Sequence, residues 1–243
     1  MLFFIFVQPV LAQSTDSINE LKKEIDTLKE NQKAMQKDIQ EIKNSLRSKQ
    51  APPEFKEAFI DLGDNPFKGD KSAKLIIAEF SDYQWPYCAR HVRETLPEIE
   101  KEYIATGKVK YVFLDFPLPF HKQAFKAAEA AHCAGDQGKY WEMHNQLFAN
   151  QKAMEPKDLT EYAKTIGLDS QKFQQCLNSG KYAEEIKKDI AEAQKAGVTG
   201  APAFFFGYAE PDKPNTIKAT KMLKGAQPYS KFKESIDSLL LQK

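Results

Sequence analysis

The apolar residues of segment 14–50 recur every three or four positions, and charged or polar residues occupy the positions between them. In a heptad frame, the a and d positions hold Ile18, Leu21, Ile25, Leu28, Gln32, Met35, Ile39, Ile42 and Leu46. The segment contains no Gly, Pro or aromatic residue, and Pro52 and Pro53 end the pattern. This sustained repeat predicts a coiled-coil helix over residues 14–50.

The charges beside this apolar stripe fit a parallel, in-register partner of the same sequence. The flanking positions hold Glu24 and Asp38 at g, and Lys29 and Lys43 at e. We therefore expect a homo-oligomer formed through residues 18–46. Ile at a with Leu at d favours a dimer, whereas Ile42 at d and Gln32 at a leave a trimer open. The alternative is a single amphipathic helix that folds back on its own domain.

After a linker at 51–64, the pattern changes to alternating strand and helix signals. Buried strands are predicted at Leu75–Phe80 and Val109–Phe116, with a helix from Pro86 towards Thr106 between them. Residues 122–197 are helical almost throughout, and two strands (Ala203–Gly207 and Ile217–Leu223) and a helix (Ser230–Leu241) follow. This order predicts an α/β domain at 65–243 with a thioredoxin-like fold, an inserted helical subdomain and the coiled-coil helix before it.

The first twelve residues, MLFFIFVQPVLA, are mostly apolar and end with the small-residue spacing of Val10 and Ala12. We interpret segment 1–12 as a signal peptide. It is short and lacks Lys and Arg, which points to a true start upstream of Met1. As a membrane anchor it is too short, because ~12 residues cover about 18 Å of a ~30 Å hydrocarbon core. The alternative is a frayed apolar terminus.

Composition narrows the possible functions. The 243 residues include 35 Lys+Arg and 34 Asp+Glu, a net charge of +1, which argues against a nucleic-acid-binding protein. With 42% hydrophobic residues the chain can bury a core. Its three cysteines stand far apart, so they allow one disulfide with a free thiol, a shared metal site, or three free thiols.

Three separate runs carry a family resemblance. They are FSDYQWPYCARHV (80–92), AAHCAGDQGKYWEMHNQLF (130–148) and VTGAPAFFFG (198–207). From about Asn65 to the C-terminus, the chain resembles the DsbA-like thioredoxin family of exported bacterial thiol-disulfide oxidoreductases. The coiled-coil segment lies outside the resemblance, although some family members resemble this chain in carrying an N-terminal oligomerising helix.

The resemblance implies a location and partners as well as a fold. It implies export to the periplasm or cell envelope, polypeptide substrates among other exported proteins, a membrane redox partner, and no cofactor. Export also favours structural disulfides, because the compartment is oxidising.

The first run departs from the family pattern at the redox motif. Where the family has Cys-x-x-Cys, this chain reads Trp85-Pro86-Tyr87-Cys88. The chemistry needs two thiols, because the first attacks or releases the substrate sulfur and the second resolves the mixed disulfide. We therefore expect impaired redox activity. For Cys88, slow single-thiol chemistry, an inert or merely oxidisable thiol, and a Trp85 variant of an active parent all stay open.

The resemblance also assigns roles to residues near this motif. Glu79 would act as a base towards Cys88; the alternative is a strand residue satisfied by local hydrogen bonds. Pro202 would be cis, with the backbone of Ala201 pairing with a bound peptide beside Trp85, Pro86 and Tyr87. The alternative is a trans proline that starts an edge strand.

The other two cysteines, Cys133 and Cys176, match family positions that form a disulfide, and the alternative is two buried thiols. Cys88 and His91 have a spacing that could supply two metal ligands, but no second pair occurs at ligand spacing, so no metal site is predicted. His121, His132 and His144 are expected to be capping or partly exposed residues.

The leading functional interpretation is an exported thiol-disulfide oxidoreductase, active in disulfide formation, reduction or isomerisation in principle and impaired by Trp85. The alternative is a non-catalytic peptide-binding or chaperone-like module oligomerised by its coiled coil, in which several weak sites act together. A third possibility is a structural spacer in the cell envelope.

Overall fold

The computed structural model describes residues 10–49 and 55–241, which fall into two units, 1–54 and 55–243. Most of the predicted signal peptide, residues 1–9, lies outside the described residues. The start of the predicted linker, residues 50–54, does so as well.

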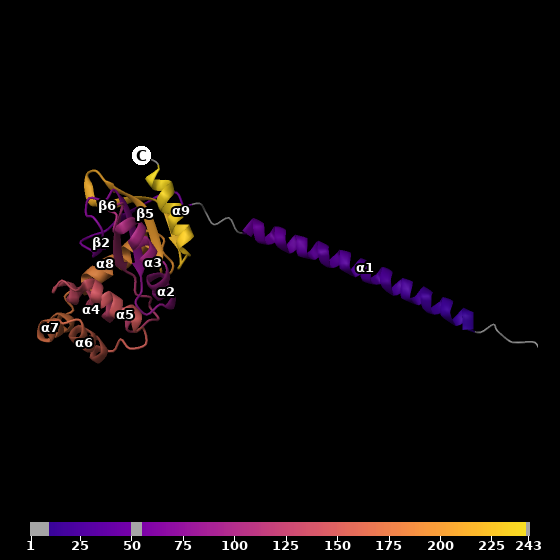
Figure 1. The fold of residues 1–243 in the computed structure, drawn as a ribbon, viewed down its shortest axis with the longest axis horizontal. Helices are drawn as coiled ribbons and strands as arrows, with labels where there is room; N and C mark the ends of the chain where they lie inside the picture. The colour runs from indigo at the N-terminus through magenta and orange to yellow at the C-terminus, as the bar shows by residue number, and fades with distance from the viewer. Residues whose placement is uncertain (1–9, 50–54, 242–243) are drawn as a thin grey trace, which may run out of the picture. The chain divides into compact units, whose positions relative to one another are not determined.

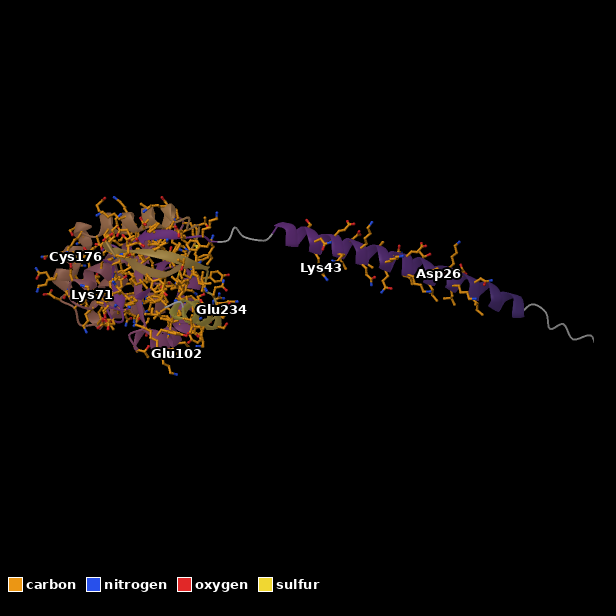
Figure 2. All side chains as sticks on the ribbon, turned by 90° about the horizontal axis from the view of Figure 1, so that it is seen from above. Asp26, Lys43, Lys71, Glu102, Cys176 and Glu234 are labelled. Carbon is orange, nitrogen blue, oxygen red and sulfur yellow. A yellow bond between two sulfur atoms is a disulfide. The ribbon has the colours of Figure 1, made fainter. Side chains whose placement is uncertain are left out.

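The N-terminal unit consists of α1 (Val10–Lys49), a continuous helix of 40 residues and about 60 Å. Seven of its apolar a and d side chains are 48–66% exposed. They are Ile18, Leu21, Ile25, Leu28, Met35, Ile39 and Ile42. Figure 2 shows side chains projecting from both edges of the helix in that view. The helix is confirmed, and self-association stays a prediction. None of the helices in the described part of the chain is long and apolar enough to cross a membrane.

A mixed sheet of six strands forms the centre of the second unit, in the order β1-β6-β5-β3-β4-β2. Figure 1 shows this unit with β2, β5 and β6 labelled. The strands are β1 (Ala58–Asp61), β2 (Phe67–Lys68), β3 (Leu75–Ser81), β4 (Val109–Asp115), β5 (Ala203–Glu210) and β6 (Lys213–Lys224). Strands β3 and β4 are parallel and all other pairs are antiparallel. The predicted thioredoxin-like α/β fold is confirmed.

Helices cover both faces of this sheet. They are α2 (Pro86–Glu94), α3 (Leu96–Ile99), η1 (Glu100–Ile104), α4 (Ala124–Gly135), α5 (Tyr140–Ala149), α6 (Pro156–Thr165), α7 (Ser170–Ser179), α8 (Ala183–Lys195) and α9 (Tyr229–Leu240). Ile76 and Ala78 of β3 pack in the larger core with the insertion helices, whereas Leu75 and Ile77 pack with α3 and α9. Strand β3 is buried along its whole length because both of its faces are covered.

The structure corrects several expected boundaries. Residues 58–61, expected in the linker, form the edge strand β1, which pairs with β6 and buries Ile60, so the folded domain starts near residue 55 rather than 65. A strand of four residues is too short to give a periodic signal. The helix expected from Pro86 to Thr106 is divided into α2, α3 and the π-helical turn η1.

Candidate active site

The chain makes a tight turn between β3 and α2, and its local sequence explains the geometry. Asp82 accepts a hydrogen bond from the Gln84 N–H through its side chain (2.7 Å) and one from the Trp85 N–H through its carbonyl (3.1 Å). Trp85 is the N-cap residue in an extended conformation, and Pro86 follows at the first helical position, where its fixed φ suits a helix start. The side chain of residue 85 is thereby held at the helix N-terminus.

The indole of Trp85 packs in a surface cluster of aromatic rings. Its centroid lies 5.3 Å from Tyr87, 5.5 Å from His121 and 6.0 Å from Phe120. Tyr87 is 48% exposed and Phe120 is 66% exposed, whereas Trp85 is half-buried. We call Trp85, Tyr87 and Phe120 the aromatic surface. It contains no thiol, and the Trp85 indole offers only one N–H donor.

His121 reaches this surface from the loop after β4, where it is held by Asp82. The Asp82 carboxylate lies 2.8 Å from His121 Nδ1 and also accepts the Leu118 N–H at 2.6 Å. Sequence analysis missed this pair. The order of the strands could have predicted it, since Asp82 and His121 both follow the carboxyl ends of neighbouring parallel strands. Those ends meet at one edge of a sheet.

The insertion also fixes the turn. The side-chain amide of Gln151, between α5 and α6, donates to the carbonyl oxygens of Tyr83 (2.8 Å) and Trp85 (2.9 Å). The position of residue 85 therefore depends on the inserted subdomain as well as on the thioredoxin-like sheet.

Cys88 lies on the first turn of α2 and is fully buried. It is the one free cysteine of the chain. Burial raises the pKa of its thiol well above the usual value, and the negative charge of Glu79 raises it further. A helix N-terminus favours a thiolate, but here burial outweighs that effect. Of the alternatives for Cys88, this environment favours an inert thiol.

Glu79, on β3, is fully buried as well. Its Oε2 atom accepts a hydrogen bond from the Tyr111 hydroxyl on β4, and the Tyr111 oxygen lies 3.0 Å from His91 Nε2 on α2. Burial raises the pKa of Glu79 to about 7, although the Tyr111 hydrogen bond acts in the opposite direction. The partner of Glu79 comes from another strand, so the alternative of local hydrogen bonding does not describe it.

The peptide bond between Ala201 and Pro202 is cis, as the resemblance implied. Pro202 precedes β5, whose Ala203 pairs with Phe80 of β3, so the register brings Pro202 beside Ser81 at the end of β3. The Pro202 carbonyl accepts the Gly225 N–H at 2.8 Å. Strand pairing thus brings Pro202 to the same end of the sheet as Trp85, Pro86 and Tyr87. Peptide binding by these residues and Ala201 stays a prediction.

The remaining cysteines lie away from this turn. A disulfide joins Cys133 on α4 to Cys176 on α7, with 5.8 Å between their Cα atoms, so two insertion helices are covalently linked. The expectation for two histidines is wrong: His132 and His144 are buried, because His132 pairs with Asp115 at 2.7 Å and His144 packs among core aromatic rings.

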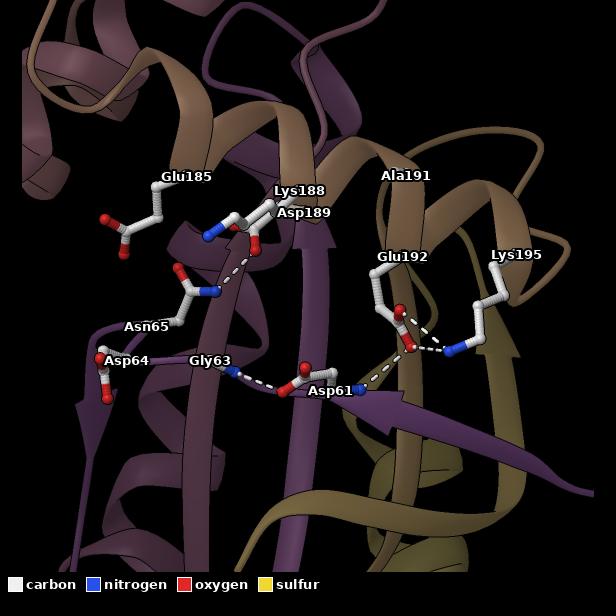
Figure 3. A pocket seen from close by; sticks show the side chains of 10 residues that line it. All are labelled: Asp61, Gly63, Asp64, Asn65, Glu185, Lys188, Asp189, Ala191, Glu192 and Lys195. Atoms are coloured by element: carbon white, nitrogen blue, oxygen red, sulfur yellow. Dashed lines mark hydrogen bonds and ion pairs between the residues drawn. The ribbon is translucent and has the colours of Figure 1, made fainter. Parts of the chain in front are cut away.

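A cavity of about 480 Å³ lies between α8 and the loop after β1 (Figure 3). Several of its polar groups bond to one another: Glu192 accepts the Asp61 N–H and pairs with Lys195, and Asp189 accepts from Asn65 at 2.7 Å. These groups hold α8 against the sheet. Within residues 10–49 and 55–241, no set of three or more His, Cys, Asp or Glu side chains is arranged to hold a metal ion.

Comparison with known proteins agrees with this architecture. A family model described as thioredoxin matches residues 61–223, more than half of the chain. The crystal structure of alpha-DsbA1 from Wolbachia pipientis is 27% identical with a TM-score of 0.61, covering 74% of this chain and 92% of that one. Oxidised BdbD from Bacillus subtilis shares the fold at 24% identity, with a TM-score of 0.65 over 76% of this chain and 97% of that one.

A curated relative carries a different name. The Na(+)/H(+) antiporter NhaA 3 of Salinispora tropica is 32% identical over 161 residues, which cover 66% of this chain and 24% of the antiporter. The chain thus spans about a quarter of the length of that relative, and the similarity is to one segment of it. The fold and the matched family model together identify the domain: the chain belongs to the thioredoxin family and is similar to its DsbA-like members.

Proposed function

We propose that this chain is an exported family member that acts on the cysteines of exported polypeptides, and that Trp85 blocks its redox cycle. The observation that carries the proposal is the start of α2, where an indole occupies the N-cap position and the remaining thiol, Cys88, is fully buried.

The block follows from the chemistry of thiol-disulfide exchange. The attacking group must be an exposed thiolate, and residue 85 is the position where the helix N-terminus would stabilise one. Cys88 is inaccessible, and burial raises its thiol pKa, so very little of it is ionised near neutral pH. The chain keeps the resolving thiol, Cys88, but lacks the thiol at residue 85 that would form the mixed disulfide with substrate.

The test restores the missing thiol. Trp85→Cys is expected to reduce insulin and to oxidise a reduced dithiol peptide, whereas the natural chain should match the uncatalysed rate. The matched control is Trp85→Cys combined with Cys88→Ser, which returns the first thiol without its resolving partner and should form mixed disulfides that do not turn over. Equal activity of the natural chain and Trp85→Cys would refute the block.

A second candidate function is non-catalytic binding of unfolded polypeptide. The aromatic surface favours it, because Tyr87 and Phe120 are largely exposed and lie at the end of the sheet where the cis-proline is kept. Exposed aromatic rings supply apolar contact area without any thiol.

This function predicts binding of a cysteine-free unfolded polypeptide, such as reduced and alkylated α-lactalbumin, by the natural chain. Phe120→Ser should weaken that binding several-fold. Phe59→Ser is the matched control, because Phe59 is 47% exposed on the edge strand β1, outside the aromatic surface. Equal losses for both variants would show that the aromatic surface has no special part.

The coiled coil adds a third element to the proposal: α1 joins copies of the chain through the apolar side chains at a and d, as a dimer or a trimer. Sedimentation equilibrium should give a multiple of the 27.7 kDa chain mass. Ile25→Glu, at an a position, should shift the protein towards the monomer, whereas Thr27→Glu, on the opposite face, should not. A monomeric natural chain would refute this assembly.

Export and re-oxidation complete the proposal. Segment 1–12 would direct export to the periplasm or cell envelope, where a membrane redox partner would re-oxidise a restored thiol pair. Cell fractionation with N-terminal sequencing of the mature protein tests the first part, since an uncleaved cytosolic chain would contradict it.

A further inference from the structure

Four buried ionisable side chains lie together beneath the start of α2. Glu79 on β3, Tyr111 on β4, and Cys88 and His91 on α2 are all fully buried. Cys88 and His91 lie one helical turn apart on α2, and hydrogen bonds join His91 to Tyr111 and Tyr111 to Glu79. The sequence resemblance assigned no role to Tyr111, and His91 was considered only as a metal ligand.

The hydrogen bonds of this group have a defined direction. A phenol has one proton, and Tyr111 donates it to Glu79 Oε2. The contact of 3.0 Å between His91 Nε2 and the Tyr111 oxygen is therefore a bond donated by His91. His91 is neutral, because burial lowers its pKa to about 3, and its Nδ1 atom has no partner among the described residues. The order is His91 to Tyr111 to Glu79.

The surroundings leave Glu79 with few other stabilising groups. Tyr111 donates the hydrogen bond to Glu79 Oε2, whereas Glu79 Oε1 has no partner among the described residues. The negative charge of an ionised Glu79 acts on Cys88, Tyr83 and Tyr111. The other charged or ionisable groups that act on the four are Asp82 on Cys88, Glu100 on Tyr111 and His144 on His91. The rings of Phe204 and Phe232 pack against His91, with ring centroids 4.4 and 5.1 Å from that of the imidazole. Among the residues that the structure describes, no Lys or Arg side chain is paired with Glu79, so the neutral Tyr111 hydroxyl is the donor that holds its carboxylate.

We propose that Tyr111 and His91 are positioning residues that hold the Glu79 carboxylate by this directed chain and so set the pH at which Glu79 accepts the proton of Cys88. The proton exchange with Cys88 rests on the proposed function; the effect of Tyr111 and His91 on Glu79 does not.

In a chain with the first thiol restored by Trp85→Cys, the proposed step is the resolution of the mixed disulfide between residue 85 and the substrate. The Cys88 thiol gives its proton to the Glu79 carboxylate, which becomes a neutral carboxylic acid. The Cys88 thiolate then attacks the sulfur of residue 85 in the mixed disulfide, so that one S–S bond forms and another breaks. The electron pair leaves with the substrate sulfur, and the substrate thiolate takes a proton from water.

The first test measures Glu79 directly in the natural chain. Carboxyl ¹³C NMR of protein labelled at glutamate follows its titration, and Glu79→Gln identifies its resonance. Tyr111→Phe removes one hydroxyl and keeps the ring, so it should raise the titration midpoint of Glu79 by about 1–2 pH units. Tyr140→Phe is the matched control, because Tyr140 is a buried tyrosine whose hydroxyl bonds to Tyr83 instead. An unchanged midpoint in Tyr111→Phe would overturn the proposal.

The part of His91 is tested by a pair of substitutions. His91→Leu removes the donor to Tyr111 and should raise the Glu79 midpoint by less than Tyr111→Phe does. His91→Gln can still donate to the Tyr111 oxygen and should bring the midpoint back towards that of the natural chain. If His91 acted through packing alone, both variants would shift the Glu79 titration midpoint equally. That result would show that His91 does not act on Glu79 through the hydrogen bond to Tyr111.

A final measurement separates this inference from the proposed function. In the Trp85→Cys background, Tyr111→Phe should shift the pH profile of thiol-disulfide exchange upward by the same amount as the NMR midpoint. A shifted midpoint with an unchanged profile would keep the positioning role and reject proton exchange between Glu79 and Cys88. Absence of exchange activity in Trp85→Cys would reject the proposed function and leave the NMR result standing.

Discussion

Removing the disulfide between Cys133 and Cys176 should destabilise the domain more than most single changes. The bond links α4 to α7 across a sequence separation of 43 residues, and Cys133 is buried. The perturbation is the double substitution Cys133→Ala and Cys176→Ala, which removes the cross-link and little side-chain volume.

The expected magnitude follows from the length of the closed loop. In the chain-entropy model, cross-linking a loop of this length lowers the entropy of the unfolded chain enough to stabilise the fold by about 4 kcal/mol at 25 °C. A natural domain has a free energy of unfolding of only about 5–15 kcal/mol. At roughly 2–4 °C for each kcal/mol in a domain of this size, the melting temperature should fall by about 8–16 °C.

The assay is urea unfolding followed by circular dichroism. The oxidised natural protein should unfold at a clearly higher urea concentration than the double variant. The natural protein with its disulfide reduced is the control, and it should resemble the variant because it lacks the same cross-link. A thiol count on the denatured, unreduced protein should give one thiol, that of Cys88.

Two results would refute this reasoning. Three reactive thiols in the unreduced protein would show that the disulfide does not form. A difference of under about 1 kcal/mol between the oxidised and reduced protein would show that the unfolded chain gains little freedom when the bond is broken.

Two further perturbations test the core and the sheet. Burial raises the pKa of Glu79 to about 7 from an unfolded value near 4.5, so the folded state holds this proton more tightly and the stability contributed by the group falls as pH rises from 4.5 through 7. In urea unfolding, the free energy of unfolding of Glu79→Gln should therefore rise relative to that of the natural chain by on the order of 3 kcal/mol between pH 4.5 and 8. A difference that stays constant over this pH range would contradict the prediction. Gly207→Ala would place a Cβ against the Lys218 carbonyl and 2.6 Å from the Ala219 Cα, at a register shift between β5 and β6. It should lower stability by about 2 kcal/mol or more in thermal unfolding, whereas Gly200→Ala, which meets nothing within 4 Å, should have little effect.

Much of the architecture was predictable because its signals are local. The heptads predicted α1, and the apolar runs at Leu75 and Val109 predicted β3 and β4. The short strands β1 and β2 were missed, because two to four residues hold no period and pair only with partners far along the chain. His132 and His144 were expected at the surface, since nothing in their sequence neighbours shows that Asp115 and a cluster of aromatic rings surround them.

The candidate site divides in the same way. The sequence showed Trp85, Cys88, Glu79 and Pro202 through a motif and its departure from the family pattern. It did not show that Tyr111 and His91 are bonded to Glu79, because those contacts join two strands and a helix. Nor did it show that His121, held by Asp82, packs against the indole.

By itself, the sequence determined that residue 85 carries an indole and no thiol, since the identity of a side chain is a property of covalent composition. It also determined the apolar stripe of α1, which depends only on helical periodicity. The tertiary structure alone decided that Cys88 is buried and that Glu79 is buried beside the Tyr111 hydroxyl. The physical reason is that burial and electrostatic environment come from residues brought together by folding, and those residues are separated along the chain.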